Sequence, residues 1–134
     1  MAAGGDYTRN RRIYGDAYTT LSFTASTDDT TLITARNVNY TIFVQRIIVW
    51  IKTSTAATET FQDHTTGKQI AVIPANPGAN TRWDFDFGPE GVPLTVAENL
   101  LWNVSATGHA GHLIVEAYQK RTVVGSANAG ATLQ

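Results

Sequence analysis

The stretch from Tyr40 to Lys52 constrains this chain most, because as a β-strand it would be apolar on both faces. Side chains alternate across a strand, which puts Ile42, Val44, Ile48 and Trp50 on one face and Phe43, Ile47, Val49 and Ile51 on the other. A strand of an antiparallel sheet normally shows one polar face to water. The second apolar face therefore calls for a second covering surface, and we expect that surface to be another subunit.

The rest of the chain divides into short alternating segments separated by turn residues. Half-buried strands are predicted where apolar and polar residues alternate, at 17–25, 81–87 and 112–119. Shorter strands are predicted at 30–34, 58–63, 69–73, 92–95 and 100–106. No segment repeats apolar residues at helical spacing over a helical length. The pattern predicts an all-β fold, a single antiparallel β-sandwich of jelly-roll or Greek-key type.

Both ends of the chain are poor in core-forming residues, and we expect them to be extended arms. The predicted organisation is an N-terminal arm at 1–16, a β-sandwich domain at 17–124 and a C-terminal tail at 125–134. The N-terminal arm carries the chain's one local run of positive charge, together with a tyrosine: Arg9, Arg11, Arg12 and Tyr14. Such a cluster is typical of a solvated terminus or of a segment that binds an acidic groove on another protein.

Composition excludes several classes of function. Charged residues are only 16% of the chain, against roughly 25% in an average soluble domain, which suits a tightly packed assembly. A net charge of −1 gives no electrostatic footprint for nucleic acid. The chain lacks an apolar run long enough for a membrane helix and the apolar centre of a secretory signal. Cysteine is absent, which excludes thiol catalysis and thiolate metal sites. We expect no cofactor, nucleic acid or membrane partner.

Two pairs of residues are weak candidates for chemistry. Asp84 and Asp86 lie about 6–7 Å apart on one strand face, close to the ~5–5.5 Å separation of retaining glycosidases, but Arg82 shares that face and favours a solvated sheet surface. His109 and His112 have the spacing of two metal ligands, whereas zinc needs three or four. We interpret them as turn or strand-edge histidines. No nucleophile elbow or phosphate-binding loop occurs, and we expect no enzymatic activity.

The three tryptophans are in phase with apolar neighbours. Trp50 follows the phase of Ile48, Trp83 that of Phe85, and Trp102 that of the leucine and valine two residues to either side. This phase favours a place in the core or in a subunit interface, and we predict that role for Ile48, Trp50, Trp83 and Phe85. The alternative is that one or two tryptophans face solvent and stack on sugars, as in a carbohydrate-binding module.

Three segments resemble small β-rich structural proteins of tailed bacteriophages, of the kind that decorate or reinforce the head. They are FVQRIIVWI at 43–51, FDFGPEGVPLT at 85–95 and LIVEAYQK at 113–120. The resemblance implies a capsid decoration protein that has no catalytic site, binds the major capsid protein on the outer head surface and forms a homo-oligomer, with a trimer favoured. It also implies synthesis in the host cytoplasm. Arg9, Arg11, Arg12 and Tyr14 are then the expected shell contacts. A head-to-tail or tail component is the structural alternative.

Overall fold

In the computed structural model, residues 30–106 and 108–122 are described in full and residues 17–23 for their backbone. No helix occurs among them. The strands are β1 (Ala17–Phe23), β2 (Thr30–Ile33), β3 (Tyr40–Thr53), β4 (Glu59–Asp63), β5 (Gln69–Ile73), β6 (Thr81–Asp86), β7 (Val92–Pro93), β8 (Leu100–Val104) and β9 (Ala110–Arg121). Both ends of each strand lie within two residues of the boundaries predicted from the sequence. The prediction of an all-β fold with antiparallel sheets is confirmed; the predicted arm and tail, 1–16 and 125–134, lie outside the described residues.

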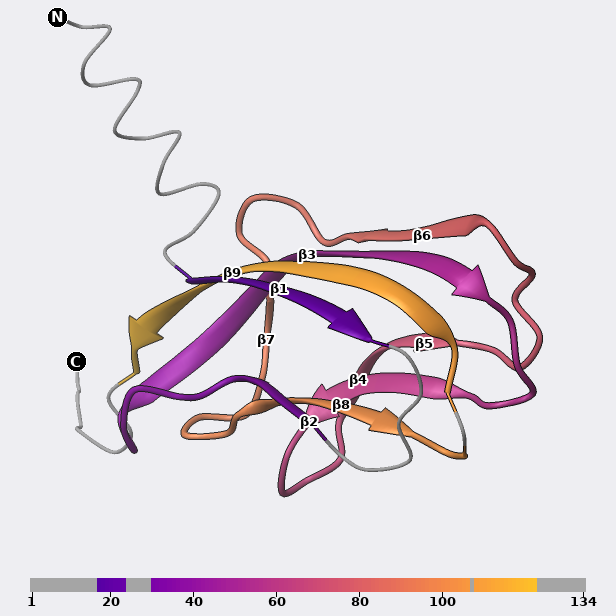
Figure 1. The fold of residues 1–134 in the computed structure, drawn as a ribbon. Coiled ribbons are helices and arrows are strands. Elements are labelled where there is room, and N and C mark those ends of the chain that lie inside the picture. The colour runs from indigo at the N-terminus through magenta and orange to yellow at the C-terminus, as the bar shows by residue number, and fades with distance from the viewer. Residues whose placement is uncertain (1–16, 24–29, 107, 123–134) are drawn as a thin grey trace, which may run out of the picture.

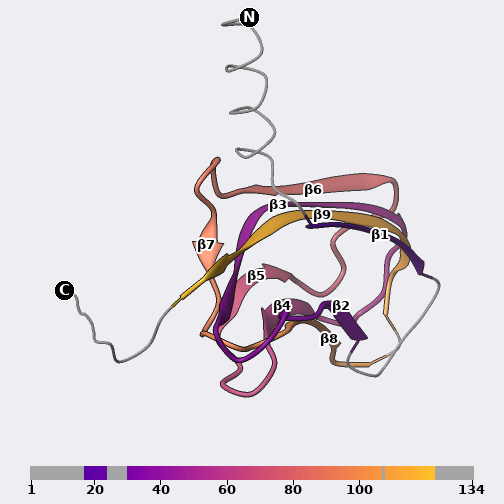
Figure 2. The same ribbon diagram turned by 90° about the vertical axis from the view of Figure 1, so that its left-hand side faces the viewer.

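The strands form two antiparallel sheets that lie as two layers (Figures 1 and 2). The five-stranded sheet has the order β1-β9-β3-β6, with β7 also paired to β3, and the four-stranded sheet has the order β2-β8-β4-β5. The pairing is nested along the chain: β4 pairs with β5, β3 with β6, β2 with β8, and β1 with β9. Each sheet therefore contains strands from both ends of the domain.

The hydrophobic core lies between the two layers. The five-stranded sheet contributes residues of β3 and β9, and the four-stranded sheet contributes residues of β4, β5 and β8. The members with no more than 1% of their surface exposed include Ile42, Val44, Ile47, Val49, Ile51, Phe61, Ile73, Leu100, Trp102, Leu113 and Val115. Burying one such large side chain contributes about 1.5–3 kcal/mol. Trp83 and Phe85 of β6 pack against this core from the edge of the five-stranded sheet.

A β-bulge at Gln45 changes the phase of β3, and it corrects one prediction. The β3–β9 register shifts between Val44 and Arg46, so one extra residue is inserted and the alternation reverses. Ile42 and Val44 before the bulge face the core, and so do the odd-numbered residues after it, from Ile47 to Ile51. The predicted single face of Ile42, Val44, Ile48 and Trp50 is therefore wrong: Ile48 and Trp50 lie on the opposite, outer face.

Glycine is required where β9 crosses β3 closely. Gly111 pairs with Ile51, next to a second register shift between Ile51 and Thr53. A Cβ atom at Gly111 would lie 1.8 Å from the Trp50 carbonyl oxygen, which no side chain permits. The close approach holds the ends of the two longest strands together.

Candidate functional site

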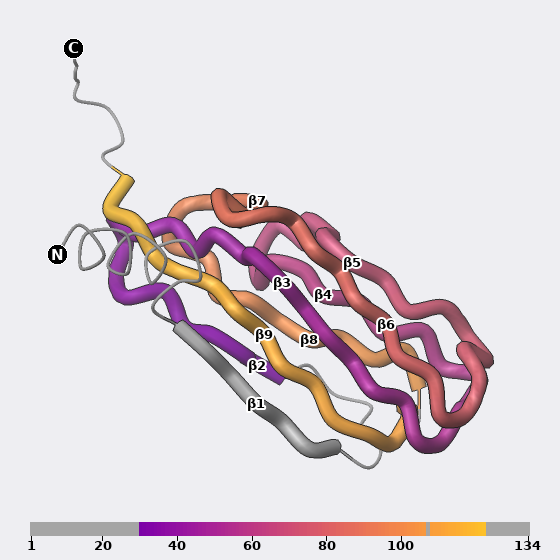
Figure 3. Tube along the Cα trace, turned by 90° about the horizontal axis from the view of Figure 1, so that it is seen from above, coloured from indigo at the N-terminus to yellow at the C-terminus, as the bar shows by residue number. Residues whose placement is uncertain are grey.

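The outer face of the five-stranded sheet, like that of the four-stranded sheet, has no covering layer among the described residues, and Figure 3 views the molecule from the five-stranded side. The centre of the five-stranded sheet's outer face consists of three rungs, each formed by one residue of β6, one of β3 and one of β9 that pair in register. Rung one is Arg82, Trp50 and His112; rung two is Asp84, Ile48 and Ile114; rung three is Asp86, Arg46 and Glu116. Trp50 is 37% exposed, and the two isoleucines are half-buried.

Arginines on this face hold Asp84 from two sides. Arg46 donates two hydrogen bonds to its carboxylate, from Nε to Oδ1 at 3.1 Å and from Nη2 to Oδ2 at 2.7 Å. Arg82 adds a third from Nη2 to Oδ2 at 3.1 Å. The Arg46 hydrogen bonds are the main reason that the pKa of Asp84 lies below its usual value, and the same contacts raise the pKa of Arg46. Asp84 therefore stays ionised, and a general-acid role for it is not supported.

A shallow hollow of about 300 Å³ adjoins Trp50 at the end of the face. It is lined by Trp50, Lys52, Asn80, Arg82 and His112, among others. The Arg82 guanidinium carbon lies 5.7 Å from the centre of the Trp50 ring, within the range of a cation–π contact. This end of the face is rich in basic groups beside one exposed aromatic ring.

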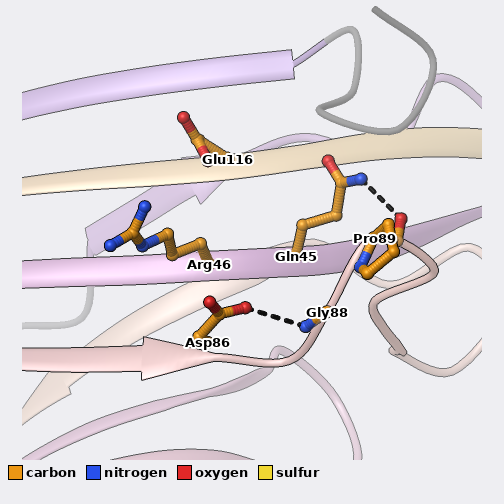
Figure 4. A pocket seen from close by; sticks show the side chains of 6 residues that line it. All are labelled: Gln45, Arg46, Asp86, Gly88, Pro89 and Glu116. Atoms are coloured by element: carbon orange, nitrogen blue, oxygen red, sulfur yellow. Dashed lines mark hydrogen bonds between the residues drawn. The ribbon is translucent and has the colours of Figure 1, made fainter. Parts of the chain in front are cut away.

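A second hollow, of about 200 Å³, lies at the opposite, acidic end of the face beside the bulge (Figure 4). Gln45 is 2% exposed, and its Nε2 donates to the Pro89 carbonyl oxygen at 2.6 Å. The Gly88 N–H donates to Asp86 Oδ1 at 2.9 Å, so the loop between β6 and β7 is fastened to both β3 and β6. Glu116 on β9 forms the far side of the hollow. Gln45 Oε1 has no hydrogen-bond partner within the described residues.

A polar cluster lies inside the core, between the sheets. Glu59 is fully buried; its Oε1 accepts from Trp102 Nε1 at 3.1 Å and its Oε2 from the His109 main-chain N–H at 2.9 Å. Burial raises the pKa of this carboxyl. His109 is also fully buried; its Nδ1 accepts from the Thr55 N–H at 2.9 Å, which places the proton of the neutral ring on Nε2. Burial lowers the His109 pKa. The cluster has no exposed group that a substrate could reach.

Asp63 fastens two loops to the end of β4. It is fully buried, and its Oδ1 accepts from the Thr66 hydroxyl and from the Lys68 N–H at 3.2 Å. Its Oδ2 accepts from the Thr95 N–H at 3.2 Å and from the Thr95 hydroxyl at 2.8 Å. Burial acts to raise the pKa of Asp63, but the four hydrogen bonds outweigh it and the pKa is lowered. The role of this carboxylate is structural.

The predicted site residues separate into three groups. Ile48 and Trp50 lie together on the outer face, whereas Trp83 and Phe85 point inward and pack on the core. Arg9, Arg11, Arg12 and Tyr14 lie outside the described residues. Of the two spaced histidines, His109 is buried in the core and His112 is on the outer face, so they do not form a pair. No group of three potential metal ligands occurs in the described part of the chain.

The two buried carboxylates, Glu59 and Asp63, were not predicted from the sequence, although two signals for them were present. Glu59, Phe61 and Asp63 alternate along β4, so that a buried Phe61 implies that both acids face the core with it. Asp63 is also followed by His-Thr-Thr-Gly, a polar stretch ending in glycine that is typical of a turn held by an aspartate side chain.

A scan against models of known protein families finds no match for this chain, and a search of curated proteins finds no relative either. Within residues 17–23, 30–106 and 108–122, no helix is long and apolar enough to cross a membrane.

Proposed function

We propose that this chain is a non-enzymatic virion structural protein that decorates and stabilises the head shell of a tailed bacteriophage as a homo-oligomer. The observation that carries the proposal is the outer face, where Trp50 is exposed and Ile48 and Ile114 are half-buried. An exposed aromatic ring beside partly buried aliphatic side chains on a sheet surface is a feature that protein interfaces commonly cover. Two of the three segments that resemble phage head proteins, 43–51 and 113–120, form the two central strands of this face.

We infer further that the strands follow a jelly-roll path. The support is the order β1-β9-β3-β6 in one sheet and β2-β8-β4-β5 in the other, with every pair nested inside the next. Eight strands in two interlocked Greek keys have this arrangement, and viral capsid and lectin domains both use it. The architecture is therefore compatible both with the proposed role and with sugar binding. The chemistry of the surface residues, and not the fold, distinguishes the two functions.

The chemistry of the carboxylates supports a non-catalytic role. A general acid or base must reach its substrate and have a pKa near the working pH. Asp84 is held by Arg46 and Arg82 with a lowered pKa, and Glu59 and Asp63 are fully buried with both oxygens engaged. None of these three carboxyl groups is both accessible to a substrate and free of protein hydrogen bonds, with a pKa suited to acid–base catalysis.

The shell partner in this proposal is the major capsid protein, and the resemblance favours a trimer on the outer head surface. Arg9, Arg11, Arg12 and Tyr14 of the N-terminal arm are the proposed contacts, because a basic arm suits an acidic groove. The structural alternative, a head-to-tail or tail component, would occur in few copies per particle. Copy number therefore separates the two.

The test is quantitative mass spectrometry of purified virions, with binding of the isolated chain to shells as a second measurement. A copy number equal to that of the major capsid protein, or a simple fraction of it, is expected for decoration; a handful of copies would favour the tail. Deleting residues 1–15 is expected to abolish shell binding, whereas deleting 125–134 at the other end of the chain serves as the control. Unchanged binding after the N-terminal deletion would contradict the role of the arm.

A carbohydrate-binding module is the second candidate, and the hollow beside Trp50 favours it specifically. An exposed tryptophan with nearby polar side chains, such as Asn80 and Arg82, can stack on a sugar ring and hydrogen-bond its hydroxyls. Glycan binding followed by tryptophan fluorescence tests this role. Trp50→Ala should abolish binding, and Val72→Ala, at a site of similar exposure (40%) on the four-stranded sheet, should not. Absence of any glycan-dependent signal would remove this candidate.

A further inference from the structure

The charges of the outer face change sign along the strands. Rung one carries Arg82, with Lys52 exposed just beyond it on β3. Rung three carries Asp86, Glu116 and Arg46, so its formal charges sum to −1. Arg46 and Arg82 both hydrogen-bond to Asp84 on rung two. One end of the face is therefore basic and the other acidic. A surface of this kind repels a copy of itself in parallel alignment and attracts one that is reversed.

A two-fold axis along rung two, crossing the strands within the interface plane, reverses the face onto itself. Each strand then lies opposite the same strand of the second copy, with rung one opposite rung three. The pairs formed between copies are Arg82 with Asp86, Trp50 with Arg46, and His112 with Glu116. These are a salt bridge, a cation–π pair and a histidine–carboxylate pair, and the symmetry repeats each of them twice.

The middle rung lies on the axis and meets itself. Ile48 faces Ile48 of the second copy and Ile114 faces Ile114, which buries the two half-exposed isoleucines at the centre of the interface. Asp84 also meets its own copy, but each Asp84 carboxylate is already neutralised by Arg46 and Arg82. The axis therefore places apolar and neutralised groups at the centre and complementary charges towards the rim, as in stable protein interfaces.

The area of the face is comparable with that of a standard interface. At about 3.4 Å per residue and about 4.8 Å between strands, the four strands of 7, 12, 14 and 6 residues cover about 640 Å² in projection. Stable complexes bury about 800 Å² per partner. β1 continues the three rungs with Ser22, Thr20 and Tyr18 in register with β9, and these residue types add no like charges.

We propose that two copies of this chain pair face to face through the outer faces of their five-stranded sheets, about a two-fold axis along the rung of Asp84, Ile48 and Ile114. The pairing rests on the proposed role of this face as a protein-docking surface, and it makes the building block a dimer in place of the trimer that the resemblance favours. Sheets packed in this way lie about 10 Å apart with their strands nearly aligned.

The test is a charge exchange between Arg82 and Asp86, followed by sedimentation equilibrium of the full-length chain. The wild-type chain, of 14.5 kDa, is expected to sediment at twice that mass. Arg82→Asp sets two aspartates against each other in the dimer, and Asp86→Arg sets two arginines against each other. Each variant alone is expected to raise the dimer Kd at least about tenfold, since every contact is repeated by symmetry.

Mixing the two variants gives the decisive result. In a mixed dimer, each aspartate at position 82 or 86 of the Arg82→Asp copy faces an arginine of the Asp86→Arg copy, so the mixture should recover a Kd within about threefold of wild type. Lys68→Asp makes the same change of charge in the turn between β4 and β5, away from the face, and should leave the Kd unchanged. A mixture no tighter than the single variants would overturn the pairing, and so would a monomeric or trimeric wild-type chain.

A second measurement does not depend on these charge variants. The chain contains no cysteine, so Ile48→Cys introduces one thiol, which the axis places opposite its own copy. A short bismaleimide should cross-link this variant into dimers, whereas Val72→Cys on the four-stranded sheet should stay uncross-linked; equal yields would overturn the proposal. A monomer that still binds phage shells would refute the pairing and leave the decoration role standing. A dimer that is absent from virions would refute the decoration role and leave the pairing standing.

Discussion

Replacing Asp63 by asparagine should destabilise the fold through a change of one atom. The asparagine side chain keeps a single oxygen, so it can satisfy either the Thr66 hydroxyl and Lys68 N–H or the Thr95 N–H and hydroxyl, but not both pairs. Its amide NH₂ then faces a main-chain N–H, donor against donor. A hydrogen bond to a charged group is worth about 1.5–3 kcal/mol. Because the threonine hydroxyls can rotate away, we expect a loss of about 3 kcal/mol in unfolding free energy at pH 7.

The loss should depend on pH with a definite sign. The pKa of Asp63 is lowered in the folded protein, so its contribution is present above the ordinary aspartate pKa and disappears as the pH falls through the folded value. The unfolding free energies of wild type and Asp63→Asn should therefore be furthest apart near neutral pH and converge as the pH falls below the ordinary aspartate pKa of about 3.9. Urea unfolding followed by circular dichroism from neutral pH down to this acid range measures both curves.

Asp86→Asn is the matched control for this prediction. It makes the same substitution at an exposed aspartate that accepts a hydrogen bond from the Gly88 N–H. At protein concentrations well below the dimer Kd, where the proposed contact with Arg82 of a second copy is absent, it should cost less than about 1 kcal/mol. In thermal unfolding, a loss of about 3 kcal/mol corresponds to about 10 °C for a chain of 134 residues, at about 2.1 cal/mol/K per residue. Equal losses at the two sites, or a difference that does not shrink in acid, would refute the role assigned to Asp63.

Other substitutions test the remaining contacts. Gly111→Ala should cost more than about 3 kcal/mol in urea unfolding, because its methyl would lie 1.8 Å from the Trp50 carbonyl oxygen. Gly88→Ala, where a methyl meets nothing within 4 Å, should cost only the strain of a positive φ, about 1 kcal/mol. Trp102→Ala should cost about 3–5 kcal/mol, and Trp50→Ala much less, since Trp102 is 1% exposed and Trp50 37%. Glu59→Gln should lower the unfolding free energy by about 2 kcal/mol near pH 4 and by less near pH 8. Burial raises the pKa of Glu59, so the stability that Glu59 contributes is lost as the pH rises through its pKa in the folded protein. A cost that increased with pH would contradict this account.

The strands were predictable from sequence because period-2 alternation and turn residues are local signals. The alternation of β6 placed Arg82 and Asp84 outside and Trp83 and Phe85 inside, as found. The pairing of strands was not predictable in this way. Nothing in the sequence of β9 indicates that Glu116 lies beside Arg46. The two residues are 70 positions apart in the chain, and only the pairing of β3 with β9 brings them together.

The buried polar groups were missed for a different reason. Composition marks Glu59, Asp63 and His109 as surface residues, since acids and histidines are rarely buried completely. What reverses the expectation is the set of donors from other segments: the Trp102 indole, the Thr95 hydroxyl and the Thr55 amide. These partners come from segments distant along the chain, so both oxygens of Glu59 and one oxygen of Asp63 are satisfied only once the tertiary structure has formed.

Arg46, the one charged residue of β3 before Lys52, could have shown from the sequence which side chains of β3 face the core. Without a bulge, Arg46 would share a face with Ile42 and Val44 and would lie in the core, where an unpaired guanidinium costs several kcal/mol. With Arg46 outside, Ile48 and Trp50 must follow it outside, because they share its alternation. The apolar residues before and after Arg46 can both reach the core only if one residue is inserted between them, and Gln45 is that residue. A strand that is apolar on both faces thus does not indicate two covered faces along its whole length. Here it indicates a change of phase, and the part that remains exposed after this change is the outer face that carries Trp50.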